Sequence, residues 1–429
     1  MEIKAWDVFI ISAFGRGDWL AVELKAAGLS VALMDVSAQL GNWPMEDIAG
    51  PFGLFMLEKY QQNFLEYISH LGNHAVVENG FTVWSGDGPI EMKSPVTAYR
   101  FSQLGFNPQL RDILSSSRVL SEKDKSNLQD GSFEAIWPLN LAAQMASTTY
   151  RPNRTALSGS QFLPLMNSFL VSRPSRDGMD RSLKWVESHG IKVFTGAQVL
   201  DVAMAGRRQL TGVELKGPEA GFFRFENLVS SLSSEETYYL NERLGKKLFP
   251  QGAIDCSWSW MRFRLKVKNC LEVNSLPRHL CWISDVMEPW THENLCILQK
   301  TASAENLDAW VRVPTVQRFN KDYLTNLGDK LVRNFEQKIP LSKPEVLTYP
   351  QAYYYTYKDL GPSRWPVHLS EDAKSRQASF FNNFFRDGTE VWGQFSLDSQ
   401  YDYQILLRNR IFEQWQQKQI KKKKELIND

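Results

Sequence analysis

The fold of this chain is decided by residues 6–35, which read WDVFIISAFGRGDWLAVELKAAGLSVALMD. The continuous apolar run Val8–Ile11 predicts a buried parallel strand. A glycine turn follows, and apolar residues then recur at helical spacing over residues 20–27. A second apolar run, Val31–Met34, ends on Asp35, where an acidic side chain would reach a ribose hydroxyl. This order predicts a dinucleotide-binding βαβ unit.

The glycine fingerprint of such a unit is only partly present. Its first glycine permits a tight turn, its second lets the backbone approach a pyrophosphate, and its third allows close helix–strand packing. The register that fits the strand end puts Ser12, Phe14 and Gly17 at these positions. A shifted register reads Gly15-x-Gly17-x-x-Leu20, which lengthens the strand and loses the packing glycine. In the favoured register the Phe14 ring would occupy the space that the pyrophosphate needs. Either register therefore predicts weakened phosphate binding at this helix N-terminus.

Composition sets the outer limits on function. The chain has 429 residues, of which 43% are hydrophobic and 23% charged, with a net charge of +1. These values are ordinary for a globular protein and give no sign of a nucleic-acid partner. No apolar run approaches the length of a transmembrane helix, and the N-terminus reads as a strand and not as a secretory leader. We therefore expect a cytoplasmic protein.

Metal and redox motifs are missing from the sequence. The cysteines lie eleven to fifteen residues apart without a C-x-x-C pair, which predicts free thiols in a reducing compartment. They are Cys256, Cys270, Cys281 and Cys296. His70 and His74 have the i,i+4 spacing of a metal site on a helix, but the Leu-Gly-Asn between them reads as a helix end. We expect no metal site.

Aromatic residues are the one compositional excess, at 12% with fourteen tryptophans. Clusters occur at 258–260, 353–357 and 380–385. Tyr353, Tyr355 and Tyr357 are the candidates for lining an apolar substrate cavity. Ordinary packing in strands and in the core is the alternative for all three clusters.

The order of segments predicts two interleaved domains. The first, of dinucleotide-binding type, takes residues 1–75, 151–250 and 385–420, and the second, a mixed-sheet substrate domain, takes 76–150 and 251–384. Residues 389–393 are read as a short strand and residues 401–420 as the last helix. The four lysines Lys421–Lys424 begin a basic tail over residues 421–429, read as solvated, with attraction to an anionic membrane surface as the alternative.

Nearly the whole chain resembles the FAD-dependent phytoene desaturase and amine oxidase class of flavoproteins. Gly41-Asn42 stands where that class has a glycine pair, and Arg173–Gly178 resembles its Pro-x-Gly-Gly helix start. Val199 occupies the position whose backbone contacts the adenine. The strand Thr211–Leu215 and the return strand Leu228–Ser231 are similar as well, which makes the middle of the chain the more specific match.

The resemblance implies an α/β fold, a Rossmann-like FAD/NAD(P)-binding domain with an interleaved mixed-sheet substrate domain. It also implies FAD as the cofactor. The positions that it implies for the cofactor are Ser12, Phe14, Gly15, Gly17, Asp35, Gly41, Val199 and Gly393. The departures cluster at these positions: two of three fingerprint glycines are replaced, Asp stands where Glu is usual, and Gly393-Gln-Phe lacks the Asp of the family's Gly-Asp segment.

Three functional hypotheses follow. The first is an FAD-dependent oxidoreductase that acts on an apolar or amine substrate, with the flavin supplying the hydride chemistry. The second is a non-catalytic binding or scaffold protein of the same fold, as the Rab GDP-dissociation inhibitors are, with a protein or an apolar molecule as its partner. The third is a site that takes a different nucleotide in a new pose. The orientation of Phe14 separates the first two hypotheses.

Overall fold

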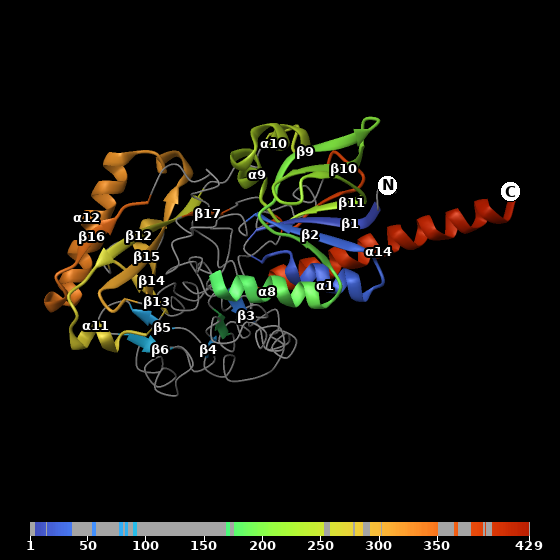
Figure 1. Ribbon diagram of the computed structural model, residues 1–429. Coiled ribbons are helices and arrows are strands. Elements are labelled where there is room, and N and C mark those ends of the chain that lie inside the picture. Colours follow the sequence, from blue (N-terminus) through green and yellow to red (C-terminus); the bar gives the residue numbers. More distant parts are fainter. Residues whose placement is uncertain are drawn as a thin grey trace, which may run out of the picture.

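Figure 1 shows a computed structural model with two large sheets at opposite sides of the molecule. The structure describes residues 5–13, 15–36, 54–56, 77–79, 82–84, 89–91, 169–171, 176–252, 258–277, 279–285, 292–301, 303–350, 364–367, 379–388, 391 and 397–428.

The first sheet has a parallel core in the order β8-β2-β1-β11, continued by the antiparallel strands β10 and β9, while β18 runs parallel to the second half of β11. Its strands are β1 (Ala5–Ser12), β2 (Val31–Asp35), β8 (Lys192–Phe194), β9 (Gln198–Ala205), β10 (Gln209–Lys216), β11 (Gly221–Ser230) and β18 (Phe384–Arg386). The predicted βαβ unit is confirmed, with β1 and β2 fully paired in parallel register.

Helices cover both faces of this sheet. They are α1 (Asp18–Ala26), α8 (Arg176–Ser188), α9 (Ser234–Leu240), α10 (Glu242–Leu248) and α14 (Leu397–Asn428). Val8 and Ile10 point into a core with α1, α8 and α14. Phe9 and Ile11, one residue on, point into a second core with α9 and α10. A strand buried on both faces needs no polar alternation, which explains the unbroken apolar run of β1.

The second sheet is mixed, in the order β16-β12-β15-β14-β13-β5-β6, with β17 beside β12. Its strands are β5 (Thr82–Trp84), β6 (Pro89–Glu91), β12 (Trp258–Lys266), β13 (His279–Ile283), β14 (Leu295–Lys300), β15 (Asn306–Pro314), β16 (Glu345–Thr348) and β17 (Arg364–Val367). The long helix α12 (Lys321–Lys338) buries its apolar stripe on one face of this sheet. Smaller elements are α11 (Leu271–Ser275), η4 (His292–Asn294), η5 (Thr315–Gln317), η6 (Pro340–Ser342) and the three-stranded sheet of β3 (Leu54–Met56), β7 (Phe169–Val171) and β4 (Val77–Asn79).

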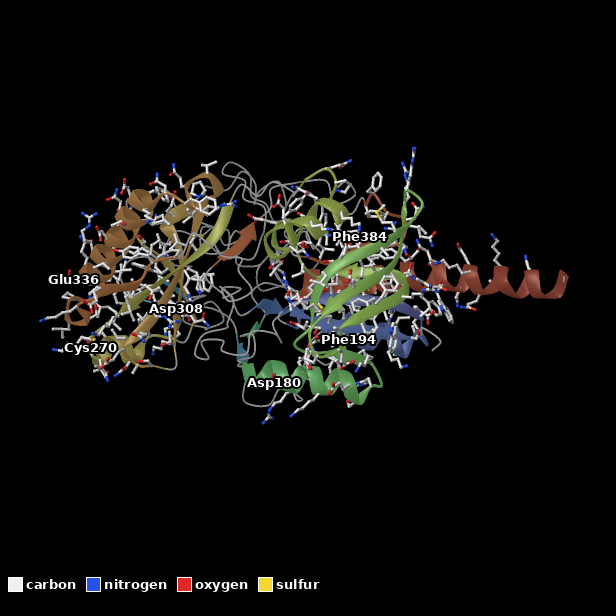
Figure 2. All side chains as sticks on the ribbon, turned by 45° about the horizontal axis from the view of Figure 1, so that its top comes forward. Asp180, Phe194, Cys270, Asp308, Glu336 and Phe384 are labelled. Atoms are coloured by element: carbon white, nitrogen blue, oxygen red, sulfur yellow. The ribbon has the colours of Figure 1, made fainter. Side chains whose placement is uncertain are left out.

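Figure 2 shows how labelled side chains divide between the two halves. Phe194 and Phe384 belong to the half built on the first sheet, and Asp308 and Glu336 to the half built on the second. A partly buried ion pair crosses between them, because Arg318, just after η5, lies 2.6 Å from the Glu235 carboxylate in α9. The predicted domain boundaries themselves stay a prediction.

Three predicted elements differ from the structure. The return strand expected at Leu228–Ser231 is the end of a longer, continuous ten-residue strand, β11 (Gly221–Ser230). Among the described residues the last strand is β18 at 384–386; of the strand expected at 389–393 only Val391 is described, and it lies in a turn. The last helix extends to Asn428, so the expected basic tail continues α14 as helix. Within the described part of the chain, no helix is both long enough and apolar enough to cross a bilayer.

Candidate functional site

The candidate site lies where β1 ends and α1 begins, at the carboxyl edge of the parallel strands. This edge is where open α/β sheets bind their ligands. Gly15 has a φ of +69°, a left-handed conformation that favours glycine. Gly17 caps α1, and a Cβ there would lie 2.9 Å from the Ile10 Cγ2 atom. This close helix–strand contact is the one that the register Ser12, Phe14, Gly17 assigns to its third glycine.

The Asp35 side chain, which was expected to reach a ribose hydroxyl, binds the loop between β1 and α1. The side chain is fully buried, and one oxygen, Oδ2, accepts hydrogen bonds from the Ser12 hydroxyl and the Gly15 amide, both at 2.9 Å. The Ser12 hydroxyl oxygen in turn accepts a 3.0 Å hydrogen bond from the Gly17 amide. The Ser12 hydroxyl therefore links the strand end, the loop and the helix start, a contact that a glycine there could not make.

Arg16 fills the interior beside this loop. Its side chain is fully buried; Nη2 lies 2.9 Å from Glu236 Oε1, and Nε donates to the Ala13 carbonyl. Glu236 also closes the N-terminus of α9, where it forms a capping box with Ser233. The sequence reading passed over Arg16, although an arginine inside a phosphate-binding fingerprint was a visible signal.

The first turn of α1 carries a second buried acid. Asp18 is fully buried and accepts a hydrogen bond from the Ser182 hydroxyl of α8. A carboxylate at a helix N-terminus is stabilised by the helix dipole, as a bound phosphate would be. Asp18 also lies over the loop, because a Cβ at Gly15 would be 3.1 Å from its Oδ2. The protein thus places its own anion at this helix end.

A third buried acid, Asp387, follows β18. Its Oδ2 accepts hydrogen bonds from the Ser231 hydroxyl at 2.9 Å and from Gln404 Nε2 at 2.6 Å. Gln400 and Gln404 each donate to the Arg16 carbonyl at 2.8 Å, which ties α14 to the loop. Asp387 thus lies between β18 and α14, whereas the resemblance led us to look for an acid before the last helix at Gly393.

Val199 lies near the start of β9, paired with Leu215 of β10. Its side chain is buried, and its carbonyl accepts a 3.1 Å hydrogen bond from the Asn241 side-chain amide. Asn241 also caps α10 through its side-chain oxygen. The Val199 carbonyl, one part of the backbone that the resemblance assigns to adenine contact, is thus bonded within the protein.

The remaining predicted site residues lie outside the described part of the chain. They are Phe14, Gly41, Gly393, Tyr353, Tyr355 and Tyr357. His70 and His74 lie outside it too. Among the residues that the structure does describe, no three His, Cys, Asp or Glu side chains form a group that could hold a metal ion.

These residues do not fit an FAD diphosphate in its usual pose. The amides of Gly15 and Gly17, which would face the phosphates, are bonded to Asp35 and to Ser12. Three buried acids surround the loop, and we refer to them as the loop carboxylates: Asp18, Asp35 and Asp387. The charge of Arg16 is paired with Glu236. A doubly charged diphosphate placed here would be repelled by these buried carboxylates.

The buried cysteines allow a direct test of the core. Burial raises the pKa of the Cys281 thiol to about 12, and it is the main cause of the raised pKa of Cys296. At pH 8 we expect iodoacetamide to leave both thiols unmodified in the folded protein, because the reactive thiolate is suppressed and hidden. Half-buried Cys270 serves as the internal control. Peptide mass spectrometry before and after urea checks this, and labelling of Cys281 as fast as Cys270 would contradict it.

The comparisons support the fold. In sequence, the chain matches no protein-family model and no curated protein. In structure, it is similar to wild-type putrescine oxidase bound to putrescine, with 11% identity, a TM-score of 0.54 and coverage of 96% of this chain and 99% of that one. It is also similar to an oxidoreductase from Methanosarcina mazei, with 14% identity, a TM-score of 0.53 and coverage of 91% and 96%. The protein therefore has the Rossmann-like FAD/NAD(P)-binding fold that it shares with these oxidoreductases, across nearly its full length.

Proposed function

We propose that this protein is a non-catalytic binding protein built on the flavoprotein fold, which does not hold FAD in the usual pose. One observation carries the proposal: Asp35 and Ser12 bond the two loop amides, of Gly15 and Gly17, that a diphosphate would need. The partner would be a protein or an apolar molecule.

The electrostatics of the loop support this proposal. A phosphate-binding helix start normally offers free amides and a positive dipole end to an anion. Here the Asp18 carboxylate lies in the first turn of α1. Asp35 at the end of β2 and Asp387 after β18 lie on either side of β1. The nearby cation, Arg16, is held by Glu236 at 2.9 Å. To admit a diphosphate, the protein would have to break these bonds and bring further negative charge beside three buried carboxylates.

The second candidate is an FAD-dependent oxidoreductase with an apolar or amine substrate. The observation that favours it is Asp387, which follows the last strand of the sheet as the family's carboxylate does. The close packing at Gly17 and the similarity to putrescine oxidase over nearly the whole chain agree with this candidate. It requires Asp35 to exchange its loop partners for a ribose, so it depends on a rearrangement of the loop.

The deciding experiment is an absorbance spectrum of the purified protein before and after incubation with FAD, followed by gel filtration. We expect no flavin band to elute with the protein, because the loop amides are already bonded. Flavin that co-elutes, and is lost in Asp35→Ala but kept in the matched variant Asp180→Ala, would overturn the proposal in favour of the oxidoreductase. Asp180 is a suitable control because its side chain is exposed on α8. Circular dichroism of both variants verifies that they fold.

The third hypothesis, a different nucleotide bound in a new pose, is tested by a second binding experiment. Titration calorimetry with ADP, NAD and adenosine compares ligands that share the adenine and differ in phosphate charge. If the loop carboxylates set the outcome, none of the phosphorylated ligands binds more tightly than adenosine. Tight binding of ADP with no binding of FAD would support the new-pose hypothesis and contradict the proposal.

A further inference from the structure

The helix α14 crosses the whole first sheet and then leaves it. At its start, Gln400 and Gln404 bond to the Arg16 carbonyl, at the carboxyl end of β1. Further along, Trp415 Nε1 donates to Asp7 near the amino end of β1, at 2.9 Å. Lys418 then lies 3.1 Å from a Glu226 carboxylate oxygen. The helix therefore runs antiparallel to β1, from the edge with the candidate site to the opposite edge.

Beyond Lys418 the helix projects from the body, as Figure 1 shows for its last turns near the label C. Ile411 is fully buried, whereas Ile420 is 54% exposed, and Lys421 and Lys424 are exposed. The eleven residues from Lys418 to Asn428 span about 15 Å of helix. An exposed helix of this length presents its side chains to a partner surface.

The charge of this segment differs sharply from that of the chain. Residues 418–424 contain five lysines and no acid, although the whole protein has 49 basic and 48 acidic residues. The exposed Ile420 lies within this segment, between Lys418 and Lys421. Basic residues flanking an exposed apolar residue on one helix are the pattern of interfacial membrane-binding helices.

We propose that the projecting end of α14, residues 418–428, docks on an anionic lipid bilayer. Lysine ammonium groups complement the lipid phosphates, and Ile420 adds apolar contact with the interface. The docking edge is opposite to the carboxyl edge of the sheet, so the candidate site stays accessible while the protein is bound. This inference does not depend on whether the protein binds a flavin.

The test is flotation of the full chain with vesicles of phosphatidylcholine alone and of phosphatidylcholine with about 30% phosphatidylglycerol. We expect the protein to float with the anionic vesicles at about 0.05 M salt, to be released at about 0.5 M, and to ignore neutral vesicles. Neutralising the four lysines should lower the partition coefficient by about 600-fold, because each lysine near the surface contributes about five-fold. That variant combines Lys421→Gln, Lys422→Gln, Lys423→Gln and Lys424→Gln.

A matched control removes the same charge from exposed lysines elsewhere in the chain. It combines Lys184→Gln, Lys216→Gln, Lys268→Gln and Lys321→Gln. This control should bind like the unaltered protein, and Ile420→Ser should weaken binding without changing its salt dependence. Equal losses in both lysine variants, or no flotation with anionic vesicles at low salt, would overturn the proposal. A preference for duplex DNA over vesicles of equal phosphate content would also overturn the proposal. The same holds if light scattering detects a dimer and α14 is buried in it.

Discussion

Replacing Arg16 with methionine is expected to lower the free energy of unfolding by about 3–5 kcal/mol. The Arg16 side chain is fully buried and its partner Glu236 is 7% exposed. Methionine has a similar length but no charge, so the Glu236 carboxylate would remain in the interior without this cation. Breaking a buried pair on one side is strongly destabilising, because the remaining buried charge loses its counter-ion and is only weakly solvated.

Urea unfolding followed by circular dichroism measures this loss. The matched control is Arg408→Met, since Arg408 pairs with Glu23 at 2.7 Å but both side chains are about a third exposed. That change should cost less than about 1 kcal/mol, as partly solvated pairs do. The double variant Arg16→Met with Glu236→Gln should recover part of the loss, because no charge is then stranded. Equal effects of Arg16→Met and Arg408→Met would refute the role given to the buried pair.

Much of the fold could be predicted from local sequence. The strands β1 and β2 are continuous apolar runs because both faces of the sheet are covered, and such runs are visible without a structure. The helix α12 forms over Lys321–Lys338 and is capped by the Asn320 side chain, a local signal that is also visible without a structure. In these segments a single local pattern determines the element.

The candidate site depended on contacts that local patterns do not contain. Asp35 was placed correctly at the end of β2. The direction of its carboxylate, however, is set by Ser12 and Gly15, which lie 23 and 20 residues away in sequence. Arg16 and Glu236 are 220 residues apart. No periodicity within either segment indicates that these two side chains meet.

The C-terminal errors have a related cause. The three residues of β18 form a strand only because they pair with β11, where Leu228 faces Phe384, so they read as an aromatic cluster in isolation. That misplaced strand concealed Asp387. The predicted last helix ends at residue 420 because the following lysine run was expected to be a solvated tail. Lysine, glutamate and leucine all favour helix, however, and no Gly or Pro interrupts them before Asn428.

Replacing Phe335 with alanine is the second large effect that we expect, about 3–5 kcal/mol of unfolding free energy. Phe335 lies on α12 with no exposed surface, and its ring meets Trp282 edge-on at 5.7 Å and Trp84 at 6.1 Å. Truncation would leave a cavity between the helix and the second sheet and would remove both aromatic contacts. Phe319→Ala is the matched control, since its side chain is 47% exposed, and it should cost less than about 1 kcal/mol.

The two large variants together test whether the halves of the molecule unfold as one. Phe335 lies in the core of the second sheet, and Arg16 lies at the edge of the first. The partly buried Arg318–Glu235 pair joins these halves, and Glu235 adjoins Glu236, the partner of Arg16. If this connection makes unfolding cooperative, Phe335→Ala and Arg16→Met shift the same urea transition, monitored by tryptophan fluorescence and by circular dichroism, and their effects add. Two separated transitions, each shifted by only one variant, would show that the pair does not couple the halves.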